Sequence, residues 1–246
     1  MGVTEHLRGT FSFLTIIPVG GKSTLDAAAR GTYMFPVVGA AIGIISGTSA
    51  YLLSLFTTPL LTAVLAVALI ELLTGLHHFD ALLDFGDGVM VKGDYRKKIN
   101  AMHDSHTGAG GFWLGIMVII AKIAVISQLH GMEILLGIFI SEISAKFSMV
   151  ASMFSGQAAY AESTTSGFCS SIKNSPHLFV ISGATSVLLS LALSYTGAAM
   201  IASGIVVALL VNRFSRKQFG GITGDTVGST DELAALFSLF ILVVVL

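Results

Sequence analysis

Long apolar runs alternate with polar connections along this chain of 246 residues. No Asp, Glu, Lys or Arg occurs between Arg30 and Glu71, and Pro59 divides that stretch into two apolar segments. Because an apolar helix of about 20 residues crosses the hydrocarbon core of a bilayer, the pattern predicts seven spans, with six as the fallback. The predicted spans are 34–56, 60–79, 110–129, 132–154, 177–195, 197–214 and 230–246.

The two ends of the chain are less regular than its middle. The run 233–246 is short, so it spans only if its helix begins near Thr230. The run 11–19 is interrupted by polar residues and no small-residue cleavage site follows it, which makes it an unconvincing signal peptide. The segment 6–19 could instead form an interfacial or re-entrant helix.

The composition excludes a soluble globular domain and a disordered chain. Charged residues make up 11% of the sequence and apolar residues 54%, with a mean hydropathy of +0.86. A soluble domain carries about 25% charged residues. Because the alternation of a β-barrel is absent, the spans must be helices. We predict an all-α, polytopic membrane bundle of about seven helices with long cytoplasmic loops, forming a single domain over residues 1–246.

The positive charges gather in the long connections, and the short ones carry none. Eleven of the 13 basic residues lie in or beside the long set: Arg8, Lys22, Arg30, Lys92, Arg96, Lys97, Lys98, Lys173, Arg213, Arg216 and Lys217. The positive-inside rule then places the N-terminus and the long loops in the cytoplasm. We expect a multi-pass protein of the cell membrane, with its C-terminus outside if the last helix spans.

Three aspartates follow the second predicted span. Asp80, Asp84 and Asp87 are four and three residues apart, so on a helix they fall within about 60° of one another. Like charges on one face repel unless a cation lies among them, and oxygen ligands suit Mg²⁺. We predict a magnesium site for phosphoryl transfer here. A zinc site with His77 and two aspartates, or a solvated acidic helix end, are the alternatives.

Two further loops carry candidate chemistry. Asp104 and Ser105 precede a glycine-rich helix start that could bind metal or phosphate. The stretch 220–233 is also glycine-rich, and Ser229 with Glu232 has the spacing of a capping box. Asp225, inside this stretch, is a candidate catalytic or metal residue, whereas Asp231 is predicted to be an acid of the first helical turn. The candidate substrate-binding residues are Ser105, Lys92, Arg96, Lys146, Gly221, Thr223, Gly224 and Thr226.

A few polar or small residues inside the spans need an explanation. Glu142 and Lys146 are four apart and can pair on one helix face, and Lys122 can pair with Glu71 across helices. Lys146 could instead contact a phosphate. The ridge of Gly39, Gly43 and Gly47 predicts close packing of the first span against another helix.

Several ordered motifs resemble one enzyme family. The stretch 75–88 resembles the G-G-L-H-x-D-G-L-A-D-x-x-D-G signature of the adenosylcobinamide-GDP ribazoletransferases, also called cobalamin 5′-phosphate synthases. The segments 13–19, 35–39, 104–108 and 220–228 resemble further motifs of that family, in the same order. Ile16, His106 and Lys146 stand where the family usually has Arg, and Ala81 replaces a glycine.

The resemblance implies a Mg²⁺-dependent transferase of the last stage of cobalamin biosynthesis. It implies that adenosylcobinamide-GDP joins to α-ribazole or its 5′-phosphate, releasing GMP and giving adenosylcobalamin or its phosphate. Asp80, Asp84 and Asp87 would bind Mg²⁺. Asp84, Asp104, Asp225 and His78 are then the candidate catalytic residues, of which Asp104, Asp225 and His78 compete for the role of base.

Two other functions are weighed against this one. A CDP-alcohol phosphotransferase-like lipid enzyme would share the aspartates and Mg²⁺, but its D-G-x-x-A-R…G-x-x-x-D-x-x-x-D pattern is absent. A cation transporter would use Glu71, Lys122 and Glu142 as relay groups, yet most acids lie in loops. The expected partners are the corrinoid nucleotide, α-ribazole and the lipid bilayer. No nucleic acid is expected, and a homo-oligomer stays open.

Overall fold

The protein is seen here in a computed structural model that describes residues 2–21, 23–191 and 194–245. These residues fold into helices, and their only β-type pairing is one isolated bridge between Ala158 and Ile222. Lys22 and Leu246 lie outside the described residues, as do positions 192–193 of the predicted span 177–195. The helices are α1 (Val3–Leu14), α2 (Leu25–Arg30), η1 (Thr32–Met34), α3 (Phe35–Ser54), α4 (Pro59–Leu73), α5 (His77–Met90), α6 (Tyr95–Met102), α7 (Ala109–Ile126), α8 (Met132–Ser155), α9 (Thr164–Lys173), α10 (Pro176–Ser190), α11 (Ser194–Phe219) and α12 (Gly224–Val245).

Five helices are long and apolar enough to cross a membrane, and a sixth span arises if α4 and α5 are counted as one broken span. The five are Thr32–Ser54, Ala109–Ile126, Met132–Ser155, Tyr195–Phe219 and Gly224–Val245. The other two predicted spans correspond to α4 and α10, which have 15 residues each. Such a helix is only about 22 Å long, short of the ~30 Å hydrocarbon core. The predicted all-helical membrane bundle is confirmed, whereas the count of seven full spans is not.

The chain bends by 93° between α4 and α5. Gly75 and Leu76 adopt left-handed conformations, with φ of 63° and 61°, and this ends α4 at Leu73. Left-handed backbone is uncommon for a residue such as Leu76. The predicted helix over 60–79 is therefore wrong at its end. As a result, the axis of α5, which carries the three aspartates, is nearly perpendicular to that of α4.

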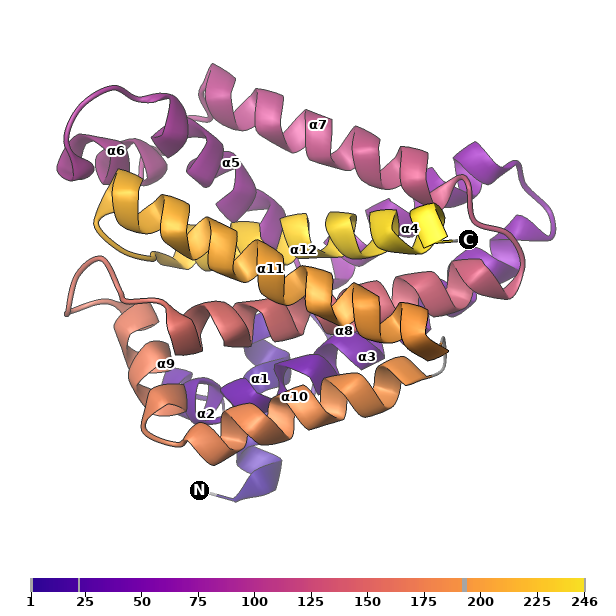
Figure 1. Cartoon of the computed structure of the whole chain (residues 1–246), viewed down its shortest axis with the longest axis horizontal. Coiled ribbons are helices and arrows are strands. Elements are labelled where there is room, and N and C mark those ends of the chain that lie inside the picture. The colour runs from indigo at the N-terminus through magenta and orange to yellow at the C-terminus, as the bar shows by residue number, and fades with distance from the viewer. Residues whose placement is uncertain (1, 22, 192–193, 246) are drawn as a thin grey trace.

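α8 is the central helix of the bundle and packs against α3, α11 and α12 (Figure 1). The glycine ridge of α3 faces it. A Cβ atom added at Gly43 would lie 2.7 Å from the Cα of Phe139, and one at Gly47 would lie 2.7 Å from the carbonyl oxygen of Leu135. The predicted close packing of this ridge is confirmed, because only glycine lets the two backbones approach this closely.

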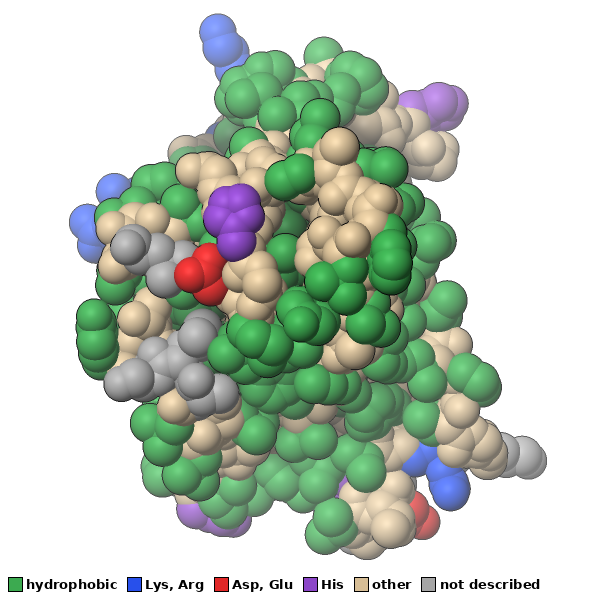
Figure 2. Space-filling view, turned by 90° about the vertical axis from the view of Figure 1, so that its right-hand side faces the viewer, with side chains coloured by type: hydrophobic (Ala, Val, Ile, Leu, Met, Phe, Trp, Pro, Cys, Tyr) green, Lys and Arg blue, Asp and Glu red, His purple; other side chains and the backbone are tan. Residues whose placement is uncertain are grey.

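The long connections gather at one end of the molecule. In Figure 1, α6, α9 and the turn between α11 and α12 lie at the left, while the α7–α8 connection and the C-terminus lie at the right. Figure 2 looks onto that right-hand end and shows mainly hydrophobic and uncharged groups. This arrangement agrees with the predicted alternation of long and short connections. That the left-hand end faces the cytoplasm stays a prediction from the positive-inside rule.

The last helix begins earlier than predicted. α12 starts at Gly224, so its 22 residues are long enough to span. Its N-terminus is capped by Thr223, whose Oγ1 accepts from the amide of Thr226 at 3.2 Å while the Thr226 hydroxyl accepts from the amide of Thr223 at 2.8 Å. The predicted capping box of Ser229 and Glu232 is wrong, because both residues lie inside the helix.

Candidate active site

The three aspartates of α5 lie on its more exposed face. Asp80 is exposed, and Asp84 and Asp87 are half-buried. α5 packs against α7 and α12. The carboxylate of Asp84 lies within electrostatic range of those of Asp80, Asp87 and also Asp225. The structure therefore brings Asp225 to the cluster predicted from the helix spacing.

Asp225 reaches the cluster because α12 and α5 approach closely. A Cβ atom added at Gly228 would lie 2.5 Å from the Cβ of Ala81, so small residues permit the contact. The hydroxyl of Ser229 donates to the carbonyl oxygen of Ala81 at 3.0 Å and ties the two helices together. Asp225 itself accepts a hydrogen bond from the Thr223 hydroxyl at 3.3 Å. The N-terminal cap of α12 thus holds this carboxylate in place.

Asp87 also caps the N-terminus of α7. Its Oδ2 accepts from the amide of Gly108 at 2.7 Å, and its Oδ1 accepts from the amide of Gly111 at 2.8 Å. A carboxylate has about four lone-pair sites, so each oxygen retains one for a metal ion. These hydrogen bonds hold Asp87 in a single position. The glycine-rich stretch at the start of the third predicted span supplies the two amides that they use.

The four carboxylates have the donor chemistry of a hard cation. Among the described residues, none of Asp80, Asp84, Asp87 and Asp225 forms an ion pair with a lysine or arginine. Neighbouring carboxylates without a counter-charge repel one another. Oxygen donors fit Mg²⁺ better than zinc, which prefers nitrogen and sulfur ligands.

His78 lies on another side of α5, inside the bundle. Its Nδ1 is 3.1 Å from the Oδ2 of Asp231, and both side chains are buried. Asp231 accepts two hydrogen bonds from the Nζ of Lys146, at 2.7 and 2.9 Å. Lys146 in turn lies 3.6 Å from Glu142, which confirms their predicted pairing. Asp231 is not a first-turn helix acid as predicted. It orients His78 and neutralises Lys146.

A second buried cation lies beside this network. Lys122 is 3.2 Å from Glu71, as predicted, and also pairs closely with Glu232 of α12. His78, Asp231 and Glu232 lie close enough together to hold a metal ion. Their acidic groups are already matched by lysine ammonium groups, so this cluster is better explained as a structural network. The groups suggested as a transporter relay are all engaged in these pairs.

The other predicted substrate residues are placed differently. Lys146 is fully buried, so its predicted contact with a phosphate of a soluble substrate is not supported by its position. Lys92, Arg96, Asp104 and Ser105 are exposed, and no hydrogen bond or ion pair between described residues joins them to the aspartates. Asp104 accepts a hydrogen bond from the backbone amide of His106 at 3.0 Å, and this bond, with the His106 ring, lowers the pKa of Asp104.

A cavity of about 450 Å³ opens beside His78 and Asp225. Apolar side chains such as Phe13 and Met149 form much of its wall. It shares Phe168 with a larger cavity of about 650 Å³ between α2 and α9.

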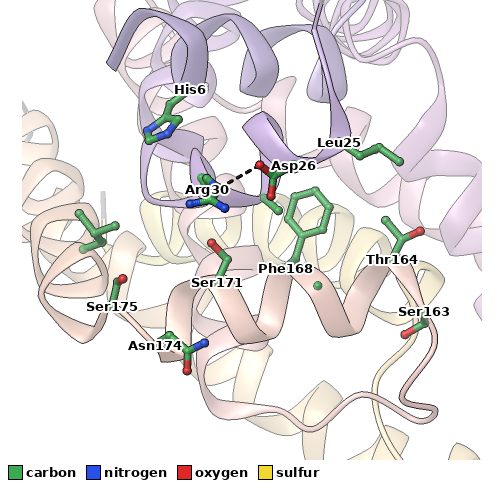
Figure 3. A pocket seen from close by; sticks show the side chains of 13 residues that line it. His6, Leu25, Asp26, Arg30, Ser163, Thr164, Phe168, Ser171, Asn174 and Ser175 are labelled. Carbon is green, nitrogen blue, oxygen red and sulfur yellow. Dashed lines mark hydrogen bonds and ion pairs between the residues drawn. The ribbon is translucent and has the colours of Figure 1, made fainter. Parts of the chain in front are cut away.

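The larger cavity has polar groups on facing walls. In Figure 3, Asp26 and Arg30 of α2 lie across it from Ser171 and Phe168 of α9, and the Arg30 Nε donates to Asp26 at 2.9 Å. The sequence does not predict α9 as part of a site, because its polar residues form no motif and line a cavity only by facing α2.

A model of the cobalamin-5-phosphate synthase family matches residues 6–243. This chain belongs to that family. The matched stretch contains every residue of the aspartate cluster. The family comprises transferases of cobalamin biosynthesis, and the resemblance noted from the motifs is thereby confirmed.

Curated relatives match along almost the whole chain. The adenosylcobinamide-GDP ribazoletransferase of Methanococcoides burtonii is 33% identical, with 99% of this chain and 93% of the relative covered. The enzyme of the same name from Pyrococcus abyssi is also 33% identical, over 96% of this chain and 97% of the relative. The one from Methanocella arvoryzae is 30% identical, over 98% and 96%. No solved structure matches this chain.

Proposed function

We propose that this protein joins adenosylcobinamide-GDP to α-ribazole or its 5′-phosphate and releases GMP. The observation that carries the proposal is the convergence of Asp80, Asp84 and Asp87 of α5 with Asp225 of α12, in a family member. The relatives are adenosylcobinamide-GDP ribazoletransferases, and that activity indicates the nucleotide substrate and the group transferred. The product would be adenosylcobalamin or its phosphate.

The reaction requires attack on a pyrophosphate. The ribazole hydroxyl oxygen forms a bond to the phosphorus attached to cobinamide, and the bond from that phosphorus to the bridging oxygen breaks. GMP leaves with the electron pair, and the hydroxyl proton passes to a base. Asp80, Asp84 and Asp87 would hold Mg²⁺, with Asp225 completing the set. The ion would supply the positive charge that neutralises the pyrophosphate.

His78 and Asp225 are the two base candidates that line the cavity of about 450 Å³. The Oδ2 of Asp231 lies 3.1 Å from the Nδ1 of His78. A proton on Nδ1, facing this carboxylate, would leave Nε2 as the acceptor. This is the orientation in which a neutral imidazole takes a proton from a hydroxyl. Asp104 is exposed on a separate loop, so we place it as a substrate contact or outer metal ligand.

The experiment is an assay of GMP release by the purified, lipid-reconstituted protein, given adenosylcobinamide-GDP and α-ribazole. We expect release with Mg²⁺ and none after chelation. Asp84→Asn should abolish release while leaving a folded protein. Asp94→Asn is the matched control, because Asp94 caps α6 through the amide of Lys97 and asparagine caps a helix equally well. Absence of a corrinoid product with any divalent cation would overturn the proposal.

A further inference from the structure

An apolar groove of about 560 Å³ runs along the outside of the bundle. α5 and α7 form one wall, with Val89, Trp113 and Leu114. α11 forms the other wall, with Leu210 and Phe214. Because α7 and α11 are both long enough to cross a membrane, a groove between them faces the lipid phase. A partner here must carry an apolar part.

A polar pocket of about 420 Å³ adjoins this groove at the end of α11. Arg213 and Lys217 line both the groove and the pocket, so the two cavities meet at these side chains. Arg216 and Asn212 also line the pocket. The amide of Asn212 donates to the Ser152 carbonyl oxygen at 2.9 Å and to the Ser155 hydroxyl at 3.0 Å, so its position is set by α8.

The charged side chains that line the groove and the pocket are all basic. No carboxylate lines either cavity within the described part of the chain. Arg213, Arg216 and Lys217 are exposed and form no ion pair with any described residue. Trp113 is 58% exposed on the groove wall, and tryptophan is typical of the membrane–water interface. Basic residues at the membrane–water interface attract acidic lipid headgroups.

We propose that the groove and the pocket together bind one anionic phospholipid. Its acyl chains lie along Val89, Leu114 and Leu210, its phosphate lies between Arg213 and Lys217, and its headgroup enters the pocket beside Asn212. A soluble phosphate would satisfy the cations but leave the apolar walls uncovered. A zwitterionic lipid would cover the walls but bring an extra positive charge to three cations.

The bound lipid would lie on the back of the helix that carries the aspartate cluster. Phe85, Gly86 and Val89 line the groove, and the helical period places Asp80 and Asp84 on the opposite side of α5. α5 therefore lies between the lipid and the aspartates. This gives a physical reason for holding a transferase of soluble substrates at a membrane. The binding proposal itself is independent of the reaction proposed above.

The chain provides its own probe for this site, because Trp113 is its only tryptophan. The purified protein is reconstituted into vesicles of phosphatidylcholine and phosphatidylglycerol, in which either one or the other lipid carries brominated chains. Bromine quenches tryptophan fluorescence at contact, so the two series give the relative affinity of the groove for each lipid. We expect a preference for phosphatidylglycerol of about fivefold for each cation that acts on the headgroup.

Two double variants separate the site from general surface charge. Arg213→Gln with Lys217→Gln should remove most of the preference and leave at most the contribution of Arg216. Arg30→Gln with Lys97→Gln removes the same charge elsewhere on the surface and should leave the preference unchanged. If the first variant does not fold, Arg213→Lys with Lys217→Arg keeps both charges, and it should keep a preference for phosphatidylglycerol.

Three outcomes overturn the proposal. One is equal quenching by the two brominated lipids in the unaltered protein. Another is an equal loss of preference in both glutamine variants. The third is removal of the preference by millimolar inorganic phosphate or GMP, which would show that the cations serve a soluble anion.

Discussion

His78 Nδ1 lies 3.1 Å from the Oδ2 of Asp231, and this contact joins α5 to α12 inside the bundle. The same carboxylate accepts two hydrogen bonds from Lys146 of α8. Asp231, predicted to be an acid of a first helical turn, therefore connects α5, α8 and α12. The histidine of the signature motif is held by tertiary contacts and not by its own helix.

Asp231→Asn should destabilise the protein, because it removes the main counter-charge of the buried Lys146. Breaking a buried pair costs about 3–5 kcal/mol, and the nearby Glu142 should reduce that figure here. The measurement is thermal unfolding in detergent, with Asp94→Asn as the control. The triple change Asp231→Asn, Lys146→Met and Glu142→Gln should recover part of the loss, since it leaves no unpaired charge in this network. Equal instability of the single and triple variants would contradict this.

Mg²⁺ should raise the Tm of the protein, because four carboxylates without a counter-charge repel one another in its absence. A ligand at 100 times its Kd stabilises the folded state by about 2.7 kcal/mol. The shift is measured after chelation and again after adding Mg²⁺ or Zn²⁺. Asp84→Asn should lose it, and Asp94→Asn should retain it. A shift with Zn²⁺ alone would favour the zinc site with His77.

Asp80 and Asp87 should respond differently to substitution by alanine. Asp87→Ala removes two hydrogen bonds from the start of α7, and loss of a helix cap costs about 0.5–2 kcal/mol. Asp80 is exposed, so Asp80→Ala should weaken Mg²⁺ binding and should not lower the unfolding temperature without metal. Comparing the two Tm values in the presence of a chelator tests this. Equal Tm values would mean that Asp87 does not cap α7 in solution.

Gly228→Ala should lower both stability and GMP release. The added methyl group would lie 2.5 Å from the Cβ of Ala81 and push α12 and its Asp225 away from α5. Overpacking of this kind costs about 1–3 kcal/mol. Ala81→Gly in the same chain makes room and should restore part of both properties. The expectation fails if the double variant is no better than the single one.

As the pH falls, the contribution of Asp104 to stability should be lost only below the ordinary pKa of an aspartate. Hydrogen bonding to His106 lowers the pKa of Asp104 in the folded state, so this contribution is present above the ordinary aspartate pKa and is lost as the pH falls through the lowered one. Carbon-detected NMR of the carboxyl group measures the pKa directly. His106→Ala should raise it only in part, because the backbone hydrogen bond remains. An unchanged pKa would show that the ring contributes nothing.

Much of the aspartate cluster could be predicted from the sequence, because it lies on one helix. Spacings of four and three residues place Asp80, Asp84 and Asp87 on one face wherever that helix goes. Asp225 was a candidate only as an acid in a glycine-rich stretch. Its approach to Asp84 depends on the close contact of Gly228 with Ala81, which joins positions about 150 residues apart.

The sequence by itself determined that this is a helical membrane protein, which face of α5 is acidic, and which residues can pair within one helix. These properties follow from hydropathy and from the period of the α-helix, and both are local. Only the tertiary structure decided the 93° bend after Leu73, the start of α12 at Gly224 and the contact of His78 with Asp231. These features depend on how helices pack and where buried charges find partners, and no stretch of neighbouring residues contains that information.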